Sequence, residues 1–146
     1  MPEKETLERA EKDKREGKAA STQAGEFVRE EIEHVREGKH GARSSKQAIA
    51  IGLSKARRAG VELPPPEEGA APEKTREQAE RELRSGKSAT KPSSKRSRAT
   101  KKALKREPHK AASKAALSRH AKSAAHKRTK AERSASAKKA ARTRKK

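Results

Sequence analysis

Large apolar residues are too few in this chain to build one core for its whole length. Leucine, isoleucine, valine and phenylalanine account for 13 of the 146 residues, and nine of these 13 lie between residues 21 and 63. A content well below roughly 20%, combined with high net charge, is typical of chains with extensive disorder. The sequence therefore predicts a mostly α-helical protein with one small folded part and long segments that lack a core.

Residues 21–66 have the apolar pattern of a helical hairpin that ends in prolines. A serine or threonine at 21–22 is suited to cap the first helix, and a serine at 44–45 is suited to cap the second. Gly38 and Gly60 are placed to end these two helices, because glycine readily adopts the left-handed conformation of a C-cap. We expect a small N-terminal helical hairpin here, near the lower size limit for independent folding.

Charged segments flank this hairpin. Residues 1–20 predict a charged helix, residues 67–86 a linker and a second charged helix, and residues 87–146 a basic low-complexity tail. Like-charge repulsion opposes helix formation in the tail until an anion arrives. We therefore expect the tail to be largely disordered or transiently helical and to lack a core. Binding is expected to add helix over about 94–107 and 110–141.

A glycine followed by a lysine recurs at Gly17, Gly38 and Gly86, each time at the expected end of a helix. One interpretation is a repeated phosphate contact. The favoured interpretation is three helix C-caps, because nothing around these glycines has the spacing of a phosphate-binding loop.

All of the net positive charge lies in the tail. Residues 1–86 contain 18 Lys/Arg and 18 Asp/Glu, whereas residues 87–146 contain 23 Lys/Arg against only Glu107 and Glu132. The tail therefore supplies the whole formal charge of +21. Such a block needs an external polyanion, and we expect nucleic acid, with duplex DNA favoured and RNA as the alternative. The implied mechanism is phosphate neutralisation with counterion release, independent of base sequence.

The candidate phosphate contacts are bases near the end of the second hairpin helix and along the tail. Lys46 and Gln47, near the start of that helix, leave open a helix-turn-helix that reads bases, although a supporting third helix is not predicted. The candidate nucleic-acid-binding residues are Lys55, Arg57, Arg58, Lys95, Arg96, Arg98, Lys101, Lys102, Lys105, Arg106, Lys127, Arg128, Lys130, Lys138, Lys139, Arg142, Arg144, Lys145 and Lys146.

The composition argues against several other classes of protein. The chain has no cysteine, no apolar run of membrane-spanning length and no signal-peptide pattern at its start. We expect no enzyme activity, cofactor, small-molecule substrate or metal, and a membrane partner is disfavoured. The histidines show no metal-binding spacing and are interpreted as surface residues; they are His34, His40, His109, His120 and His126.

Two stretches of the hairpin resemble a known family. Residues 21–32, Ser-Thr-Gln-Ala-Gly-Glu-Phe-Val-Arg-Glu-Glu-Ile, and residues 36–60 are similar to small basic bacterial proteins that are uncharacterised and often labelled DNA-binding. The tail resembles, by composition, the C-terminal domain of linker histone. The resemblance implies a bacterial cytoplasmic protein at the nucleoid, with a histone-like role.

Three alternatives stay open. One is that the tail binds structured RNA at the ribosome or acidic proteins, since both present polyanions. Another is a hydrophilic stress-protective protein. Self-association is a further option, because the acidic face at 26–37 of one molecule is complementary to the tail of another.

Overall fold

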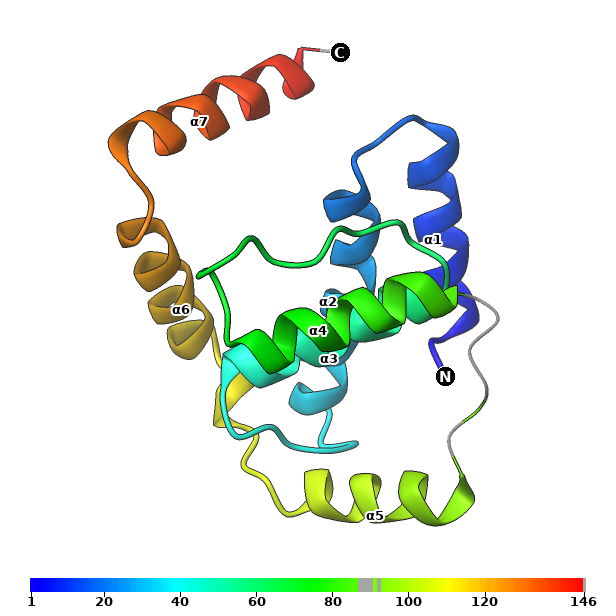
Figure 1. The fold of residues 1–146 in the computed structure, drawn as a ribbon. Coiled ribbons are helices and arrows are strands. Elements are labelled where there is room, and N and C mark those ends of the chain that lie inside the picture. The colour runs from blue at the N-terminus through cyan, green and yellow to red at the C-terminus, as the bar shows by residue number, and fades with distance from the viewer. Residues whose placement is uncertain (87–90, 92, 146) are drawn as a thin grey trace.

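The computed structural model describes residues 1–86, 91 and 93–145, and within them it contains helices and no strand (Figure 1). The mostly α-helical prediction is confirmed. The elements in chain order are α1 (Lys4–Arg15), α2 (Ala20–Arg36), α3 (Ser45–Arg58), α4 (Glu73–Ser85), α5 (Ser94–Lys105), the 3-10 turn η2 (Lys110–Ala112), α6 (Lys114–His126) and α7 (Lys130–Arg144). None of the helices in this described part has both the length and the apolar character needed to cross a bilayer.

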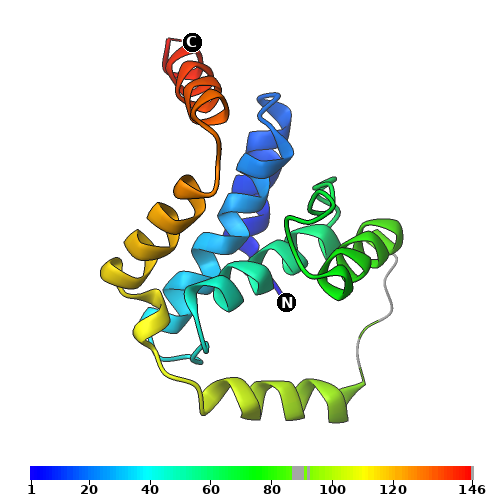
Figure 2. The same ribbon diagram turned by 60° about the vertical axis from the view of Figure 1, so that its left-hand side comes forward.

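The first hydrophobic cluster joins α1, α2 and α3 around the only aromatic side chain of the chain. Phe27 of α2 is 1% exposed and lies in one cluster with Ala10 of α1 and Val61, just beyond α3. Gly52 allows α3 to approach α2 closely, because a Cβ at this position would lie 2.6 Å from the Cα of Val28. Figure 2 shows α1 lying beside α2, with α3 crossing near them. The charged helix α1 therefore folds together with α2 and α3, and we call residues 1–66 the head.

The predicted helix ends at Gly38 and Gly60 are confirmed. Both glycines have positive φ, +74° and +96°, which a residue with a Cβ rarely adopts. After Gly60, the N–H of Val61 donates to the carbonyl of Ala56 over 3.0 Å, and Val61 is itself buried. The N–H of Gly60 also donates to the carbonyl of Arg57 over 3.0 Å. The two hydrogen bonds and the buried Val61 side chain form a Schellman motif with its hydrophobic contact.

The cap predicted at 44–45 is confirmed, and the cap predicted at 21–22 is wrong. The Ser44 hydroxyl accepts a hydrogen bond from the backbone N–H of Gln47 over 3.2 Å. By contrast, α2 begins at Ala20 with Ala19 as its N-cap, so Ser21 and Thr22 lie inside the first turn. The tight turn at the end of α1 brings the chain into α2 before these residues.

The middle of the tail packs against the loop between α2 and α3. We call residues 104–117 the docked segment. The backbone N–H groups of Gly41 and Ala42 donate to the carbonyls of Leu104 and Pro108 over 2.8 and 3.0 Å. The loop and the tail thus satisfy each other's backbone groups, as buried polar groups require.

The docked segment also contributes to a second hydrophobic cluster. Ala111 and Ala112 are 7% and 0% exposed and lie in one cluster with Ile32 and Val35 of α2. Arg36 closes this contact, since its Nε donates to the carbonyl of Ala112 over 2.8 Å. The prediction of a tail without any core is therefore wrong for this segment, because Ala111 and Ala112 are buried in the cluster and the partly buried Leu117 packs against it.

The rest of the tail is helical and exposed. Every residue from Ala121 to Lys145 is exposed, and α5 and α7 lie at opposite ends of the molecule (Figure 1). Within the described residues the structure does not support a largely disordered tail. The helix expected over 110–141 is present in pieces, which are separated at Ser113 and at 127–129.

Polar caps explain the two breaks. The Ser113 hydroxyl accepts from the N–H of Ala116 over 3.1 Å and starts α6. Thr129 and Glu132 form a capping box that starts α7, in which each side chain bonds the other residue's backbone N–H. Each cap fixes a new helix start, so the alanine-rich sequence does not continue as one helix.

Replacing Gly41 by alanine is expected to release the docked segment. A Cβ at Gly41 would overlap the backbone carbonyl of Glu107, which no side-chain rotation relieves. We expect the free energy of unfolding to fall by about 1–3 kcal/mol, as in other overpacked sites. Hydrogen exchange should become faster at the amides of residues 41 and 42, which lose their carbonyl partners, and within the docked segment.

The matched control is Gly25→Ala. Nothing lies within 4 Å of a Cβ at Gly25, which is inside α2. Because alanine is a better helix former than glycine, this change should stabilise the protein by about 0.5–1 kcal/mol. Unchanged exchange in Gly41→Ala would show that the docking contact is absent in solution.

Candidate nucleic-acid interface

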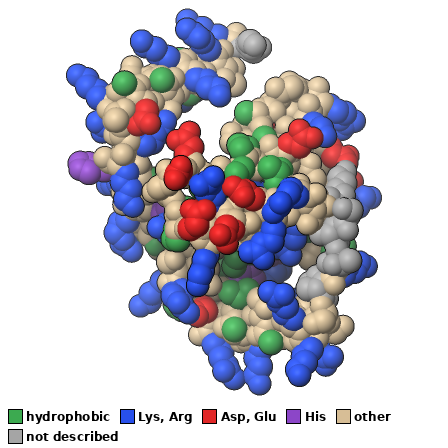
Figure 3. Space-filling model, in the orientation of Figure 1, with side chains coloured by type: hydrophobic (Ala, Val, Ile, Leu, Met, Phe, Trp, Pro, Cys, Tyr) green, Lys and Arg blue, Asp and Glu red, His purple; other side chains and the backbone are tan. Residues whose placement is uncertain are grey.

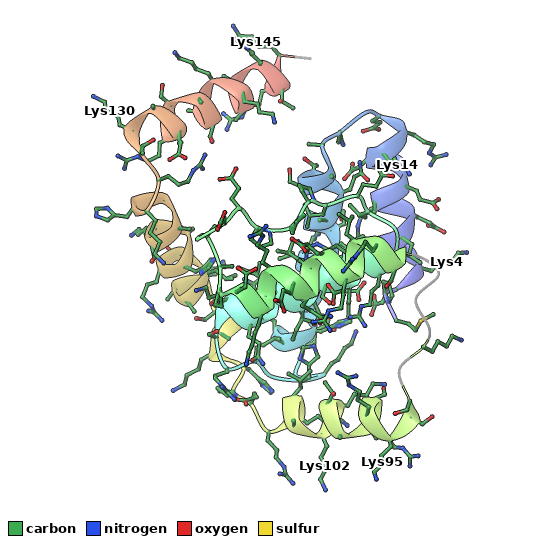
Figure 4. All side chains as sticks on the ribbon, viewed as in Figure 1. Lys4, Lys14, Lys95, Lys102, Lys130 and Lys145 are labelled. Carbon is green, nitrogen blue, oxygen red and sulfur yellow. The ribbon has the colours of Figure 1, made fainter. Side chains whose placement is uncertain are left out.

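Two helices of the tail present basic side chains at separate ends of the molecule. Figure 4 shows Lys95 and Lys102 of α5 pointing away from the body of the protein, and Lys130 and Lys145 at the two ends of α7. All the described candidate bases of the tail are exposed. They are Lys95, Arg96, Arg98, Lys101, Lys102, Lys105 and Arg106 at α5, and Lys127, Arg128, Lys130, Lys138, Lys139, Arg142, Arg144 and Lys145 at α7. The remaining candidate, Lys146, lies outside the described residues.

The bases of the tail differ from those of the head in their pairing. No Lys or Arg within the described stretch 94–145 forms an ion pair in this structure. In the head, by contrast, the Nζ of Lys18 lies 2.8 Å from carboxylate oxygens of both Asp13 and Glu16. Hydrogen bonds to these two carboxylates raise the pKa of Lys18. The cations of this described stretch are thus left without an ion-pair partner.

A basic cavity of about 350 Å³ lies where the docked segment and α6 meet the start of α3. Its basic lining consists of Arg43, Lys46, Lys110, Arg119 and His120, and the N-terminal turn of α3 lines it too. A helix N-terminus carries a partial positive charge and N–H groups without intrahelical partners. The cavity therefore has the charge and the donors to hold a phosphate group.

Most of this lining is absent from the candidates taken from the sequence. Lys46 was considered there only as a base-reading residue of α3. Residues 43–46 and 110–120 meet only because the docked segment folds back onto the head. No local pattern signals this juxtaposition.

Two of the three candidate bases on α3 are engaged inside the protein. Lys55 contacts two buried carboxylates of α2. Arg57 is 7% exposed and donates to two carbonyls of the proline-rich segment that follows α3, each over 3.2 Å. Burial lowers the pKa of Arg57. Only Arg58 of the three is exposed.

Gln47, the candidate base-reading residue, belongs to the cap of α3. Its side-chain oxygen accepts from the backbone N–H of Arg43 over 2.7 Å, and its own N–H donates to Ser44. The hairpin does have supporting helices, since α1 packs on α2 and α4 packs on α3. The apolar pattern of residues 21–66 alone does not predict these supporting helices.

Two buried glutamates hold α2, the N-terminal residues and α3 together. Glu30 and Glu31 are 2% and 1% exposed. Glu30 accepts from the backbone N–H of Glu3 over 3.0 Å and lies 3.3 Å from the Nζ of Lys55. Burial alone would raise the pKa of Glu30, but hydrogen bonds from the N–H of Glu3, the hydroxyl of Thr6 and Lys55 outweigh it and lower the pKa.

We expect the protein to lose stability in acid through this group. A carboxylate whose pKa is lower in the folded state contributes stability above its unfolded pKa of about 4.5 and loses it as pH falls through the folded pKa. The free energy of unfolding, measured by urea titration at several pH values, should fall as pH drops below about 4.5. Glu30→Gln should flatten that part of the profile, and an equally steep profile in this variant would contradict the assignment.

The prediction that the histidines are surface residues is wrong for His34 and His40. Their side chains are 13% and 16% exposed and flank the carboxylate of Glu31. The Nε2 of His40 lies 3.1 Å from Glu31 Oε2, and the Nδ1 of His34 lies 3.7 Å from Glu31 Oε1. The sequence held a signal, because Glu31 and His34 are three residues apart and share a helix face. His40 joins them through the turn at Gly38.

A family of unknown function, DUF6496, matches residues 5–67, which is less than half of the chain. The match covers α1, α2, α3 and the proline-rich segment after them, so α4 and the tail lie outside it. Among curated proteins and among solved structures, no significant match is found.

Proposed function

We propose that this protein binds duplex DNA without sequence preference, as a nucleoid-associated, histone-like protein of bacteria. The observation that carries the proposal is that the whole net charge of +21 lies in a tail whose described bases are exposed and unpaired. Binding works by neutralising backbone phosphates and releasing counterions. No enzymatic step is needed for this role.

The arrangement of the charges supports contact with an extended polyanion. Figure 3 shows Lys and Arg side chains along the two ends formed by α5 and α7, while acidic side chains gather nearer the middle of the same face. We call α5 and α7 the two basic arms. Because they lie at separate ends of the molecule, one polymer that passes along the molecule can contact both. A small acidic ligand would meet only one of them.

The basic cavity provides a fixed point between the arms. We propose that a backbone phosphate sits against the N-terminal turn of α3, between Lys46 and Arg119. Contacts of this kind position a protein on the duplex without reading bases. This assignment leaves Gln47 to its role in the cap.

Binding measured by fluorescence anisotropy tests the proposal. The full-length chain should bind unrelated duplex DNA sequences with equal affinity, and no less tightly than duplex RNA or polyaspartate of equal charge. Preference for RNA would support a ribosome-associated role instead, and preference for polyaspartate an acidic-protein partner. Either result would overturn the proposal.

A charge-reversal pair tests the cavity. Lys46→Glu with Arg119→Glu should make the dependence of log affinity on log salt shallower by about two, one for each lost phosphate contact. The control Lys74→Glu with Arg81→Glu makes the same charge change on exposed positions of α4. Equal effects of the two pairs would show that the cavity holds no phosphate.

A further inference from the structure

The buried carboxylate of Glu31 faces one ring nitrogen of His34 and one of His40. The Nδ1 of His40 lies 2.9 Å from the carbonyl oxygen of Gly41, and its Nε2 lies 3.1 Å from Glu31 Oε2. Both oxygens are acceptors, and a neutral imidazole carries only one N–H. If Nδ1 donates to Gly41, the lone pair of Nε2 faces a carboxylate oxygen. A cation between the two atoms, either a proton or a metal ion, removes this repulsion.

His34 repeats the arrangement from the other side. Its Nε2 lies 2.9 Å from Oε1 of Glu3, and its Nδ1 faces Glu31 at 3.7 Å. The two imidazole rings are perpendicular within about 10°, with an interplanar angle of 82° and centroids 6.1 Å apart. One ligand atom from each of Glu31, His34 and His40 lies within 4.8 Å of the other two.

We propose that Glu31, His34 and His40 form a binding site for one divalent transition-metal ion of the zinc class. The ligand atoms are Glu31 Oε2, His34 Nδ1 and His40 Nε2, with a water molecule as the fourth ligand. Two imidazoles and one carboxylate are a donor set that Zn²⁺ and Co²⁺ accept in tetrahedral geometry. Hard cations such as Mg²⁺ prefer oxygen ligands and fit this set poorly.

The groups behind the ligands support a metal site. Metal-binding histidines usually donate their second ring N–H to a carboxylate or a backbone carbonyl, which fixes the tautomer. His34 has the carboxylate of Glu3 in this position, and His40 has the carbonyl of Gly41. Lys55 contacts Glu31 as well, through Oε1, so Oε2 is the oxygen that faces His40.

The site would brace the loop that holds the tail. His40 directly precedes Gly41, whose N–H donates to the docked segment. A metal ion that joins His40 to Glu31 and His34 of α2 would hold this loop in place. Such a link does not require the loop to bury large apolar side chains. A bound ion that favours the folded state raises the melting temperature with its concentration.

Titration of the tag-free, full-length chain with Co²⁺ tests the site. We expect one ion per chain and the visible absorption of tetrahedral Co²⁺, with Zn²⁺ displacing it and Mg²⁺ having no effect. His34→Ala with His40→Ala should abolish the signal. The control His126→Ala, at the far end of α6 from the site, should retain it.

Glu3→Gln separates a metal site from a general loss of structure. This variant keeps all three ligands and should weaken Co²⁺ binding about 10–100-fold while the circular dichroism spectrum stays unchanged. Zn²⁺ should raise the melting temperature of the parent and leave that of His34→Ala with His40→Ala unchanged. The proposal fails if the double variant binds Co²⁺ as the parent does. It also fails if the parent binds none and only protonation, in metal-free buffer, stabilises it.

Discussion

Ending the chain after Arg128 is expected to remove most of its affinity for duplex DNA. The deleted residues 129–146 contain eight Lys/Arg and one Asp/Glu, so the formal charge falls from +21 to +14. If about half of these eight bases contact phosphates, the slope of log affinity against log salt becomes shallower by about four. The docked segment, the basic cavity and both hydrophobic clusters remain in this shorter chain, so the folded head should be unaffected.

Two further variants of the same 18 residues show whether charge alone is responsible. A version with the order of residues 129–146 shuffled keeps the charge and should bind as the parent does, because phosphate contacts need reach and charge but no fixed order. A version with the eight bases changed to glutamine should behave like the deletion. If the glutamine version binds duplex DNA as tightly as the parent, α7 does not contribute to the interface.

Replacing Phe27 by alanine is expected to unfold the head. Phe27 is fully buried and links α1, α2 and α3 in the first cluster, and the other members of that cluster are mostly alanines. Losing a buried phenylalanine costs about 3–5 kcal/mol. Small domains have total stabilities of about the same size, so the variant should lose its cooperative unfolding transition. Urea titration followed by circular dichroism measures this.

The matched control removes a large apolar side chain that is not buried. Leu7 of α1 is 38% exposed, and Leu7→Ala should change the free energy of unfolding by no more than about 0.5 kcal/mol. If Phe27→Ala were as stable as Leu7→Ala, the first cluster would not be the core of the head.

Features that depend on neighbours in the chain were predictable. The helix ends at Gly38 and Gly60 and the cap at Ser44 follow from local backbone preferences, and the structure confirms each of them. The concentration of net charge in the tail was also predictable, because it can be counted directly along the sequence. The helix starts inside the tail were predictable in the same way, because Ser113 and Thr129 are ordinary N-cap residues and like-charge repulsion does not prevent these local caps.

Features that join distant parts of the chain were not predictable. The hydrogen bond from Arg36 to the backbone carbonyl of Ala112 spans 76 residues. The second hydrophobic cluster takes alanines from the docked segment, and a search for large apolar residues passes over alanine. Charge patterns likewise do not show that Lys55 and Arg57 turn inward, because an exposed and a buried base have the same sequence signature. The basic cavity exists only after this long-range docking.

Binding of the tail's unpaired bases to the DNA backbone should be visible in the salt dependence of the affinity. Affinity of the full-length chain for a duplex should be measured from about 50 to 200 mM salt. If about ten bases engage phosphates, log affinity should fall against log salt with a slope near −9. A slope near zero, or no binding at the lowest salt, would contradict the account.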